Sequence, residues 1–227
     1  MNFLAHFLLA QAGDPPEFHL GAVLPDLARR AGFRLQEIHL SGLDYRTDFH
    51  MINGIRYHWK ADAEYHQSAL FLQGCEIWKS LISKEIPGQI GRKFFLYHLL
   101  SEMWLDRILL KNSPDSCQML YQSIGKVKDD PLHRLAHLLN DHQLKLVDTR
   151  DDFLNRQFIL DYSDPLKFAR IASSVFSYAS RQSFSPALQE IIASALPSVD
   201  KESGSILPVW MDFFDFFNAR HRLEQKV

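Results

Sequence analysis

Residues 91–111 read GRKFFLYHLLSEMWLDRILLK, and this stretch decides the class of fold. Its apolar positions recur at helical spacing, and Asn112-Ser113-Pro114 closes it with residues typical of a helix end. The same helical periodicity runs through almost the whole chain. No alternating run of five or more residues competes for strand, so the sequence predicts an all-α protein with about eight to eleven helices.

Proline, glycine and capping residues predict where individual helices begin and end. Asp14 precedes two prolines and reads as the N-cap of a helix that continues to about residue 30. A long helical pattern runs from about residue 47 to 74, and a lone Gly54 inside it costs only about 1 kcal/mol against alanine. Three pairs read as an N-cap followed by a first-turn proline: Asp130-Pro131, Asp164-Pro165 and Ser185-Pro186.

The composition of the 227 residues is that of an ordinary globular protein, with 46% hydrophobic and 23% charged residues. No linker rich in Pro, Gly or Ser divides the chain, so we expect one compact helical domain over residues 1–227. A formal net charge of −2 excludes a generally basic nucleic-acid binder. The two cysteines, Cys75 and Cys117, exclude a disulfide scaffold and a zinc site built from four thiolates.

The N-terminal residues MNFLAHFLLAQAG are apolar, but we expect them to form neither a targeting nor a membrane-spanning segment. A signal peptide needs a basic start, and a membrane helix needs about 20 apolar residues. We therefore expect a cytoplasmic protein that has no membrane partner. Its oligomeric state stays open.

Histidine is the unusual residue type, because seven of the eleven histidines fall within the first 98 residues. Two triplets have members four residues apart, which places each triplet as a stripe along one side of a helix. These stripes are His58, Asp62 and His66, and His98, Glu102 and Asp106. A single pair of this kind is often only a solvated i,i+4 pair. Two stripes that face each other could instead bind a divalent metal through imidazole and carboxylate groups.

Two further ionisable residues, His6 and Asp26, lie in apolar helical contexts, MNFLAHFLLA and GAVLPDLA. An ionisable side chain in such a context is costly without a partner. Together with the two stripes, they favour a site within the first 106 residues.

Four segments together resemble the acyl carrier protein phosphodiesterase family, an all-helical relative of the HD-domain metal-dependent phosphohydrolases. These segments are MNFLAH, GAVLPDLARR, GIRYHWKADAEYH and EMWLDRILLKN. They cover residues 1–112, whereas residues 113–227 form a helical remainder with no motif that aligns. The positions that match the family elements are Gly21, Leu24, Asp26, Gly54, Ile55, His58, Asp62, Glu102, Asp106 and Leu109.

The chain departs from the family pattern at several positions of the same elements. Trp59 stands where the family has arginine, His66 where it has a second aspartate, and Arg107 where it has histidine. Glu102 replaces the first aspartate of the last element, and Ala61 and Tyr65 also differ from the pattern.

The resemblance implies an HD-domain-like fold and a metal-dependent phosphodiester hydrolase of lipid metabolism, which releases 4′-phosphopantetheine from holo acyl carrier protein. The metal would be a divalent ion, Mn²⁺ first, with Fe²⁺, Zn²⁺ or Mg²⁺ as alternatives. The metal ligands it implies are His6, Asp26, His58, Asp62 and Asp106. His66 and His98 are candidates for the general acid, and Glu102 for a ligand or for a residue that orients one.

An acidic carrier protein would need a basic docking surface around the site. Residues close enough in sequence to supply it are Arg29, Arg30, Arg34, Arg56 and Lys60. A small phosphodiester is the alternative substrate. Two other functions stay open: a non-catalytic binding protein that keeps the fold, favoured by Trp59 and Arg107, and a carboxylate-bridged di-metal bundle, whose motifs use i,i+3 spacing.

Overall fold

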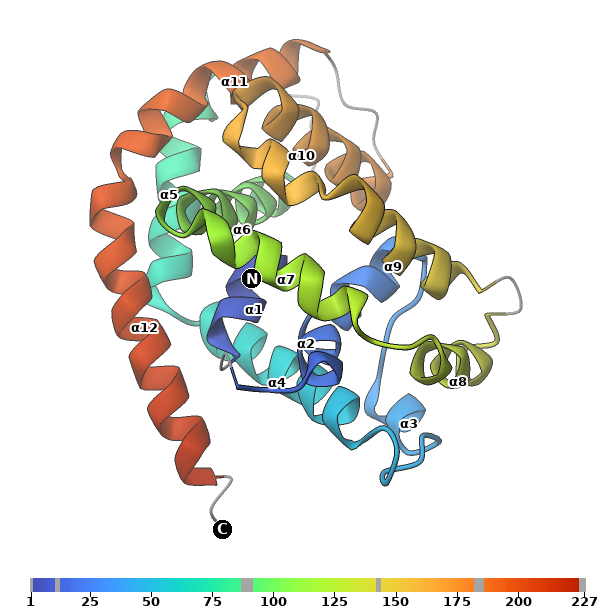
Figure 1. Ribbon diagram of the computed structural model, residues 1–227. Coiled ribbons are helices and arrows are strands. Elements are labelled where there is room, and N and C mark those ends of the chain that lie inside the picture. Colours follow the sequence, from blue (N-terminus) through green and yellow to red (C-terminus); the bar gives the residue numbers. More distant parts are fainter. Residues whose placement is uncertain (1, 11–12, 87–91, 142–143, 182–185, 225–227) are drawn as a thin grey trace. The chain divides into compact units, whose positions relative to one another are not determined.

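The computed structural model describes residues 2–10, 13–86, 92–141, 144–181 and 186–224, and every regular element in these stretches is helical (Figure 1). There are twelve α-helices and one 3-10 helix, η1, and no β-strand within these ranges. The all-α prediction is confirmed. Eleven of the helices have seven residues or more, and only α3 (Glu37–Leu40) and η1 (Phe158–Ser163) are shorter.

The chain divides into two compact units, and each unit is assembled from two separate stretches of sequence. Residues 2–62 and 113–158 form one, here called the His58 unit. Residues 63–112 and 159–227 form the other, here called the His98 unit. Each unit therefore combines part of the motif-bearing region 1–112 with part of the remainder. The expectation of a single domain stays a prediction.

The His58 unit is built around α2, which packs against α1, α7 and α9, while α8 packs against α9. Phe3 of α1 joins this core, since its ring centroid lies 5.0 Å from that of Phe153 and 5.7 Å from that of Phe158. The longer helices of the unit are α1 (Phe3–Leu9), α2 (Pro16–Arg30), α4 (Phe49–Tyr65, of which residues 49–62 belong here), α7 (Pro114–Gly125), α8 (Asp130–Leu138) and α9 (Lys145–Arg156).

Two glycines let α2 and α4 cross in direct backbone contact. A Cβ atom on Gly21 would lie 3.0 Å from the Cα of Gly54, and a Cβ on Gly54 would lie 2.9 Å from both the Gly21 Cα and the Ala22 nitrogen. Real Cβ atoms do not approach backbone this closely. Glycine is therefore required at both positions, which explains how α4 tolerates Gly54 in its interior.

In the His98 unit, α5 packs against α6, α11 and α12, and α10 packs against α6 and α11. Gly74 allows the close approach of α5 to α6, because a Cβ there would overlap the Ser101 hydroxyl. The main helices of this unit are α5 (Ala69–Ile82), α6 (Lys93–Asn112), α10 (Pro165–Ser180), α11 (Pro186–Lys201) and α12 (Ser203–Glu224).

The prediction of one helical pattern from residue 47 to 74 is wrong, because α4 ends at Tyr65 and α5 begins at Ala69. Ser68 causes the break. Its backbone is extended (φ −79°, ψ 153°), and its hydroxyl accepts a hydrogen bond from the Phe71 N–H at 3.2 Å, which caps α5. The same hydroxyl donates to the Tyr65 carbonyl at 2.6 Å.

The predicted helix starts have mixed outcomes. Asp164 caps α10 by accepting from the Lys167 N–H at 2.9 Å, as expected. Asp14 does not cap α2: Pro15 occupies the cap position, because a residue before proline avoids the helical region and the helix can begin only at Pro16. Asp130 does not cap α8 either, because the helix begins at Asp130 itself and Asp129 occupies the cap position. Ser185 lies outside the described residues.

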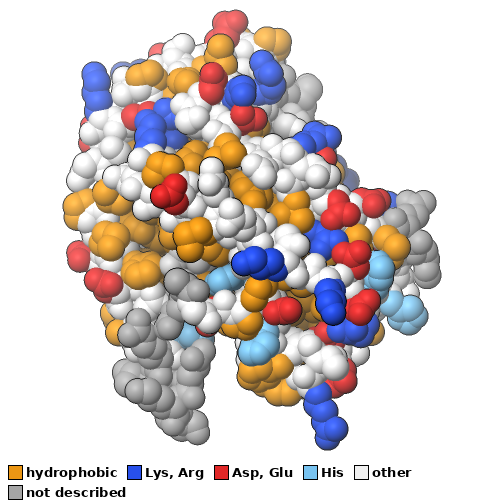
Figure 2. Space-filling view, in the orientation of Figure 1, with side chains coloured by type: hydrophobic (Ala, Val, Ile, Leu, Met, Phe, Trp, Pro, Cys, Tyr) orange, Lys and Arg blue, Asp and Glu red, His pale blue; other side chains and the backbone are white. Residues whose placement is uncertain are grey.

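The surface carries both signs of charge. On the face shown in Figure 2, Lys and Arg side chains are interspersed with Asp and Glu, in keeping with the near-neutral net charge. Among the described helices, none is both long and apolar enough to cross a membrane.

Candidate metal centre

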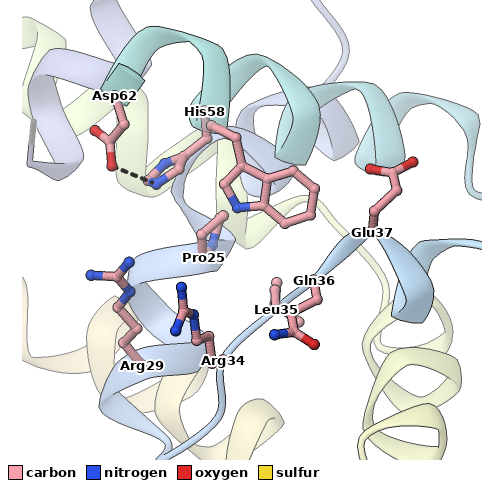
Figure 3. Close-up of a pocket in the computed structure, with 9 residues that line it drawn as sticks. Pro25, Arg29, Arg34, Leu35, Gln36, Glu37, His58 and Asp62 are labelled. Carbon is pink, nitrogen blue, oxygen red and sulfur yellow. Dashed lines mark ion pairs between the residues drawn. The ribbon is translucent and has the colours of Figure 1, made fainter. Parts of the chain in front are cut away.

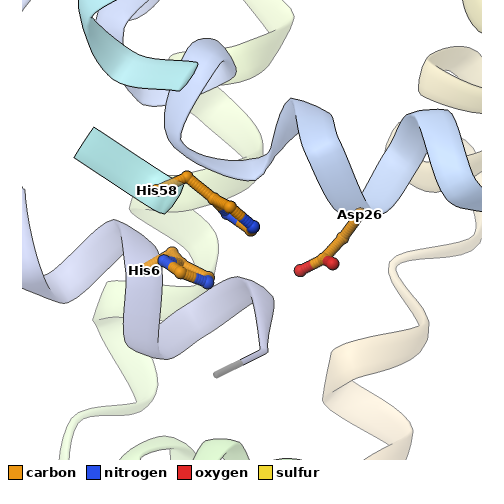
Figure 4. Close-up of side chains that lie close together, drawn as sticks. All are labelled: His6, Asp26 and His58. Carbon is orange, nitrogen blue, oxygen red and sulfur yellow. The ribbon is translucent and has the colours of Figure 1, made fainter. Parts of the chain in front are cut away.

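Four of the predicted metal ligands come together within the His58 unit. His6 lies in the middle of α1, Asp26 near the end of α2, and His58 and Asp62 one turn apart on α4. Figure 4 shows the imidazoles of His6 and His58 one above the other, with the Asp26 carboxylate facing them. One ligand atom each from His6, Asp26 and His58 lies within 4.8 Å of the other two.

His58 is held in one orientation by the backbone of α2. Its side chain is buried, and its Nδ1 lies 2.8 Å from the Ala22 carbonyl oxygen. A carbonyl can only accept, so Nδ1 carries the hydrogen and donates. The lone pair of the neutral ring is therefore on Nε2, which lies 3.4 Å from Asp62 Oδ2. A metal-binding histidine commonly donates its other ring nitrogen in this way, which fixes the tautomer.

His6 is completely buried and stacks on His58, with 3.8 Å between ring centroids and 22° between planes. Its Nε2 lies 3.1 Å from Asp62 Oδ1, but neither ring nitrogen has a hydrogen bond of good geometry within the described part of the chain. A buried polar group left in this state costs about 1–3 kcal/mol. A ligand of the two imidazoles would remove that cost, so the residues present fit a metal ion.

Burial and the neighbouring charges set the protonation of the cluster. Burial, reinforced by His58, lowers the pKa of His6 to about 3, so this ring is neutral. Burial also acts to lower the pKa of His58, but the negative charges of Asp26 and Asp62 outweigh it and the pKa is raised. For Asp62, burial acts to raise the pKa, yet the nearby ring nitrogens of His58 and His6 help to hold it well below its usual value. Asp62 is therefore a carboxylate.

The cluster opens into a cavity of about 340 Å³ that Pro25, His58 and Asp62 line on one side. Figure 3 shows the guanidinium groups of Arg29 and Arg34 pointing into this cavity. No ion pair joins either arginine to an acidic group in the described residues. Further lining residues are Trp59, Leu35, Gln36 and Glu37.

Other predicted docking arginines differ, since their charges are already paired. Arg30 lies 3.5 Å from Asp152, and Arg56 donates to Glu37 at 3.0 Å. Two guanidinium groups that have no ion pair within the described part of the chain, next to a buried His/Asp cluster, form an environment that suits a phosphate group.

The structure places the remaining predicted site residues in the His98 unit. His66, His98 and Glu102 lie close to one another there and form a second group. Asp106 is also in this unit, fully buried on α6, and belongs to neither group of clustered ligands.

Arg107, which departs from the family pattern, has a structural partner. Its guanidinium is buried and donates to Asp200 on α11 at 2.7 Å, and it also contacts the Tyr162 carbonyl. Lys111 donates to the same carboxylate at 2.6 Å. The arginine therefore joins α6 to α11 and to η1 within the His98 unit.

Three contributors to the site could not be chosen from side-chain chemistry. The Ala22 carbonyl acts through the backbone, and it faces His58 where α2 and α4 cross at Gly21 and Gly54. Leu35 and Gln36 line the cavity from the segment after α2, and no pattern in the sequence marks them.

Comparisons with protein-family models, with curated proteins and with solved structures return no match for this chain. The resemblance to the acyl carrier protein phosphodiesterases therefore stays a prediction that rests on its four segments.

Proposed function

We propose that this protein is a metal-dependent phosphodiester hydrolase whose active site is the His6, Asp26, His58 and Asp62 cluster. The observation that carries the proposal is a buried pair of stacked imidazoles that share the Asp62 carboxylate at 3.1 and 3.4 Å. This cluster borders a cavity that two arginines enter. The site unites ligands for a cation with donors for a phosphate.

His6, His58 and Asp26 would hold the cation, and Asp62 stands next to both histidines. Imidazole and carboxylate together suit Mn²⁺, Fe²⁺ or Zn²⁺ better than Mg²⁺. A divalent ion supplies Lewis-acid polarisation of a phosphoryl oxygen and makes an attacking water more acidic.

The side chains of the chain itself then have distinct tasks. Arg29 and Arg34 neutralise and orient the phosphate through their planar donor groups. Asp62, which is ionised and lines the cavity, accepts a hydrogen bond from the attacking water and orients it. The Ala22 carbonyl fixes the ring of His58, so that its Nε2 faces the site.

We propose holo acyl carrier protein as the substrate on the strength of the family resemblance, with a smaller phosphodiester as the alternative. The open cavity supports a substrate whose phosphodiester projects from a larger body, such as the pantetheine arm of a carrier protein. Arg29 and Arg34 are exposed beside the cavity and suit an acidic partner.

The test uses the full chain loaded with Mn²⁺ and three substrates: bis-p-nitrophenyl phosphate, p-nitrophenyl phosphate as the monoester control, and holo acyl carrier protein followed by mass spectrometry. We expect hydrolysis of the diester but not of the monoester. Asp26→Asn should lower kcat/KM at least about 100-fold and lower the bound Mn²⁺. Asp115→Asn, an exposed substitution on α7 of the same unit, should change neither.

Two outcomes would overturn the proposal. One is an Asp26→Asn variant with full metal content and full activity, which would exclude this cluster as the site. The other is a chain that binds Mn²⁺ and a phosphodiester without turnover, which would support the non-catalytic binding protein instead. Hydrolysis of the small diester without release of phosphopantetheine would retain the reaction and exclude the carrier-protein substrate.

A further inference from the structure

The second group of clustered ligands, His66, His98 and Glu102, lies entirely within the His98 unit. His66 belongs to the short connection between α4 and α5, whereas His98 and Glu102 lie one turn apart on α6. The group therefore brings together two segments of the chain that are 32 residues apart in sequence.

The geometry of the group is convergent. His66 Nε2 lies 2.9 Å and His98 Nε2 lies 3.0 Å from the same carboxylate oxygen, Glu102 Oε1. The two ring centroids are 4.7 Å apart. Two imidazole nitrogens and one carboxylate oxygen thus point at a single region of space, which is how three ligands of a metal ion are arranged.

Aromatic rings fix the orientation of both imidazoles. Phe71, buried at the start of α5, has its ring centroid 4.9 Å from that of His66 and 4.9 Å from that of His98, in edge contact with both. Tyr65 contacts His66 from the helix before it, at 5.6 Å between centroids. Such packing preorganises the two nitrogens before any ligand binds.

The group is also accessible from solvent. The side chains of His66 and His98 are 32% and 25% exposed and that of Glu102 is 16% exposed, whereas the rings of the first cluster are almost completely covered. One carboxylate and two imidazoles thus form a ligand set that a cation can reach.

We propose that His66, His98 and Glu102 form a second metal site, specific for a borderline transition-metal ion of the Zn²⁺ type. Two nitrogen ligands and one oxygen ligand select Zn²⁺ or Co²⁺ over Mg²⁺ and Ca²⁺, which prefer oxygen alone. Three protein ligands leave a fourth position open to water. The bound ion ties the α4–α5 connection to α6 and stabilises the His98 unit, independently of the proposed hydrolysis.

The experiment titrates the metal-free full chain with Co²⁺ and with Zn²⁺. The readouts are bound metal per chain, the visible d–d absorption of Co²⁺ and the unfolding temperature. The variants at this site are His98→Gln and His66→Asn. Because His66 lies outside any helix, the second variant tests the proposal if the first does not fold. His133→Gln is the matched control, because His133 is exposed on α8 and belongs to neither cluster.

We expect each site variant to bind one equivalent less than the wild type, and to show weaker tetrahedral Co²⁺ absorption and a smaller rise in unfolding temperature on addition of Zn²⁺, because only the first cluster still binds the ion. His133→Gln should match the wild type in all three readouts, and Asp26→Asn, at the first cluster, should keep the part of the rise that the second site contributes. The proposal is overturned if folded His66→Asn and His98→Gln bind as much Co²⁺ as the wild type with the same absorption. Because no readout is hydrolysis, its failure is distinguishable from failure of the proposed activity.

Discussion

Replacing Gly54 by alanine tests whether the crossing of α2 and α4 holds the first cluster in place. A Cβ at this position would overlap the Phe18 carbonyl and lie 2.9 Å from the Gly21 Cα and the Ala22 nitrogen. All three contacts are with backbone, which no change of rotamer can move away. Restoring an ordinary contact of 3.4 Å to the Gly21 Cα and the Ala22 nitrogen requires a separation of about 0.5 Å, and the overlap with the Phe18 carbonyl requires more.

Overpacking of this kind costs about 1–3 kcal/mol, and the higher helix propensity of alanine offsets up to about 1 kcal/mol. We expect a net loss of about 1–2 kcal/mol, which lowers the unfolding temperature by about 2–8 °C in a chain of this size. The separation also lengthens the 2.8 Å hydrogen bond from His58 Nδ1 to the Ala22 carbonyl. Loss of a bond that orients a ligand typically lowers metal affinity about 10–100-fold.

Thermal unfolding followed by circular dichroism measures the first effect, and Mn²⁺ titration of the folded variant at low temperature measures the second. Gly125→Ala is the control. Gly125 is the last residue of α7, and an added Cβ there would meet nothing within 4 Å. This control should match or slightly exceed the wild type in stability and bind Mn²⁺ equally well. A Gly54→Ala variant that matches the wild type in both measurements would refute the role of the crossing.

Three further substitutions have effects on stability or on KM that the structure predicts. Asp200→Asn removes the partner of buried Arg107 and should destabilise the fold by about 3 kcal/mol at pH 7 in urea unfolding. Burial acts to raise the pKa of Asp200, but hydrogen bonds from Arg107 and Lys111 hold it below 3.8. The stabilisation by this carboxylate is therefore present above pH 4, and the difference in stability between wild type and variant should shrink as the pH falls below that value. A difference that stays constant with pH would contradict this. Arg34→Gln should raise KM for bis-p-nitrophenyl phosphate about tenfold, because one charge-assisted contact with the phosphate is lost, and should leave the amount of bound Mn²⁺ unchanged. The control Arg46→Gln, at an exposed arginine, should alter neither KM nor bound Mn²⁺. Tyr57→Phe removes the 2.6 Å hydrogen bond from the phenol to the Leu9 carbonyl and should cost about 1–2 kcal/mol in thermal unfolding; an unchanged unfolding temperature would show that another group satisfies the carbonyl.

The all-α class could be predicted because helical periodicity and the absence of alternating runs are local properties of a sequence. Helix ends were harder, because competing caps decide them. Ser68 ends the pattern that began near residue 47, although nothing in the apolar spacing marks it. Pro15 displaces Asp14 from the cap of α2 for a reason that is also local, the restriction on a residue before proline, and this boundary could have been predicted.

The membership of the first cluster could be predicted only in part. The four-residue spacing correctly placed His58 and Asp62 on one side of a helix, and the apolar contexts of His6 and Asp26 pointed to buried partners. Periodicity does not specify which other helix a stripe faces. His66 extends the stripe in sequence but lies one residue beyond α4, and its partners are on α6. The two stripes expected to face each other therefore yield two groups, one in each unit.

Both clusters consist of a carboxylate that is flanked by two imidazoles, but their surroundings differ. Asp62 contacts His6 and His58, whose rings are buried and stack on each other. The same carboxylate lines a cavity that Arg29 and Arg34 also line. Glu102 lies between His66 and His98, which are partly exposed and packed against an aromatic ring. Arginine donors for a phosphate beside buried ligands for a cation make the first environment suit hydrolysis of a phosphodiester. The second group connects two segments of one unit, so the same ligand types there suit a stabilising ion.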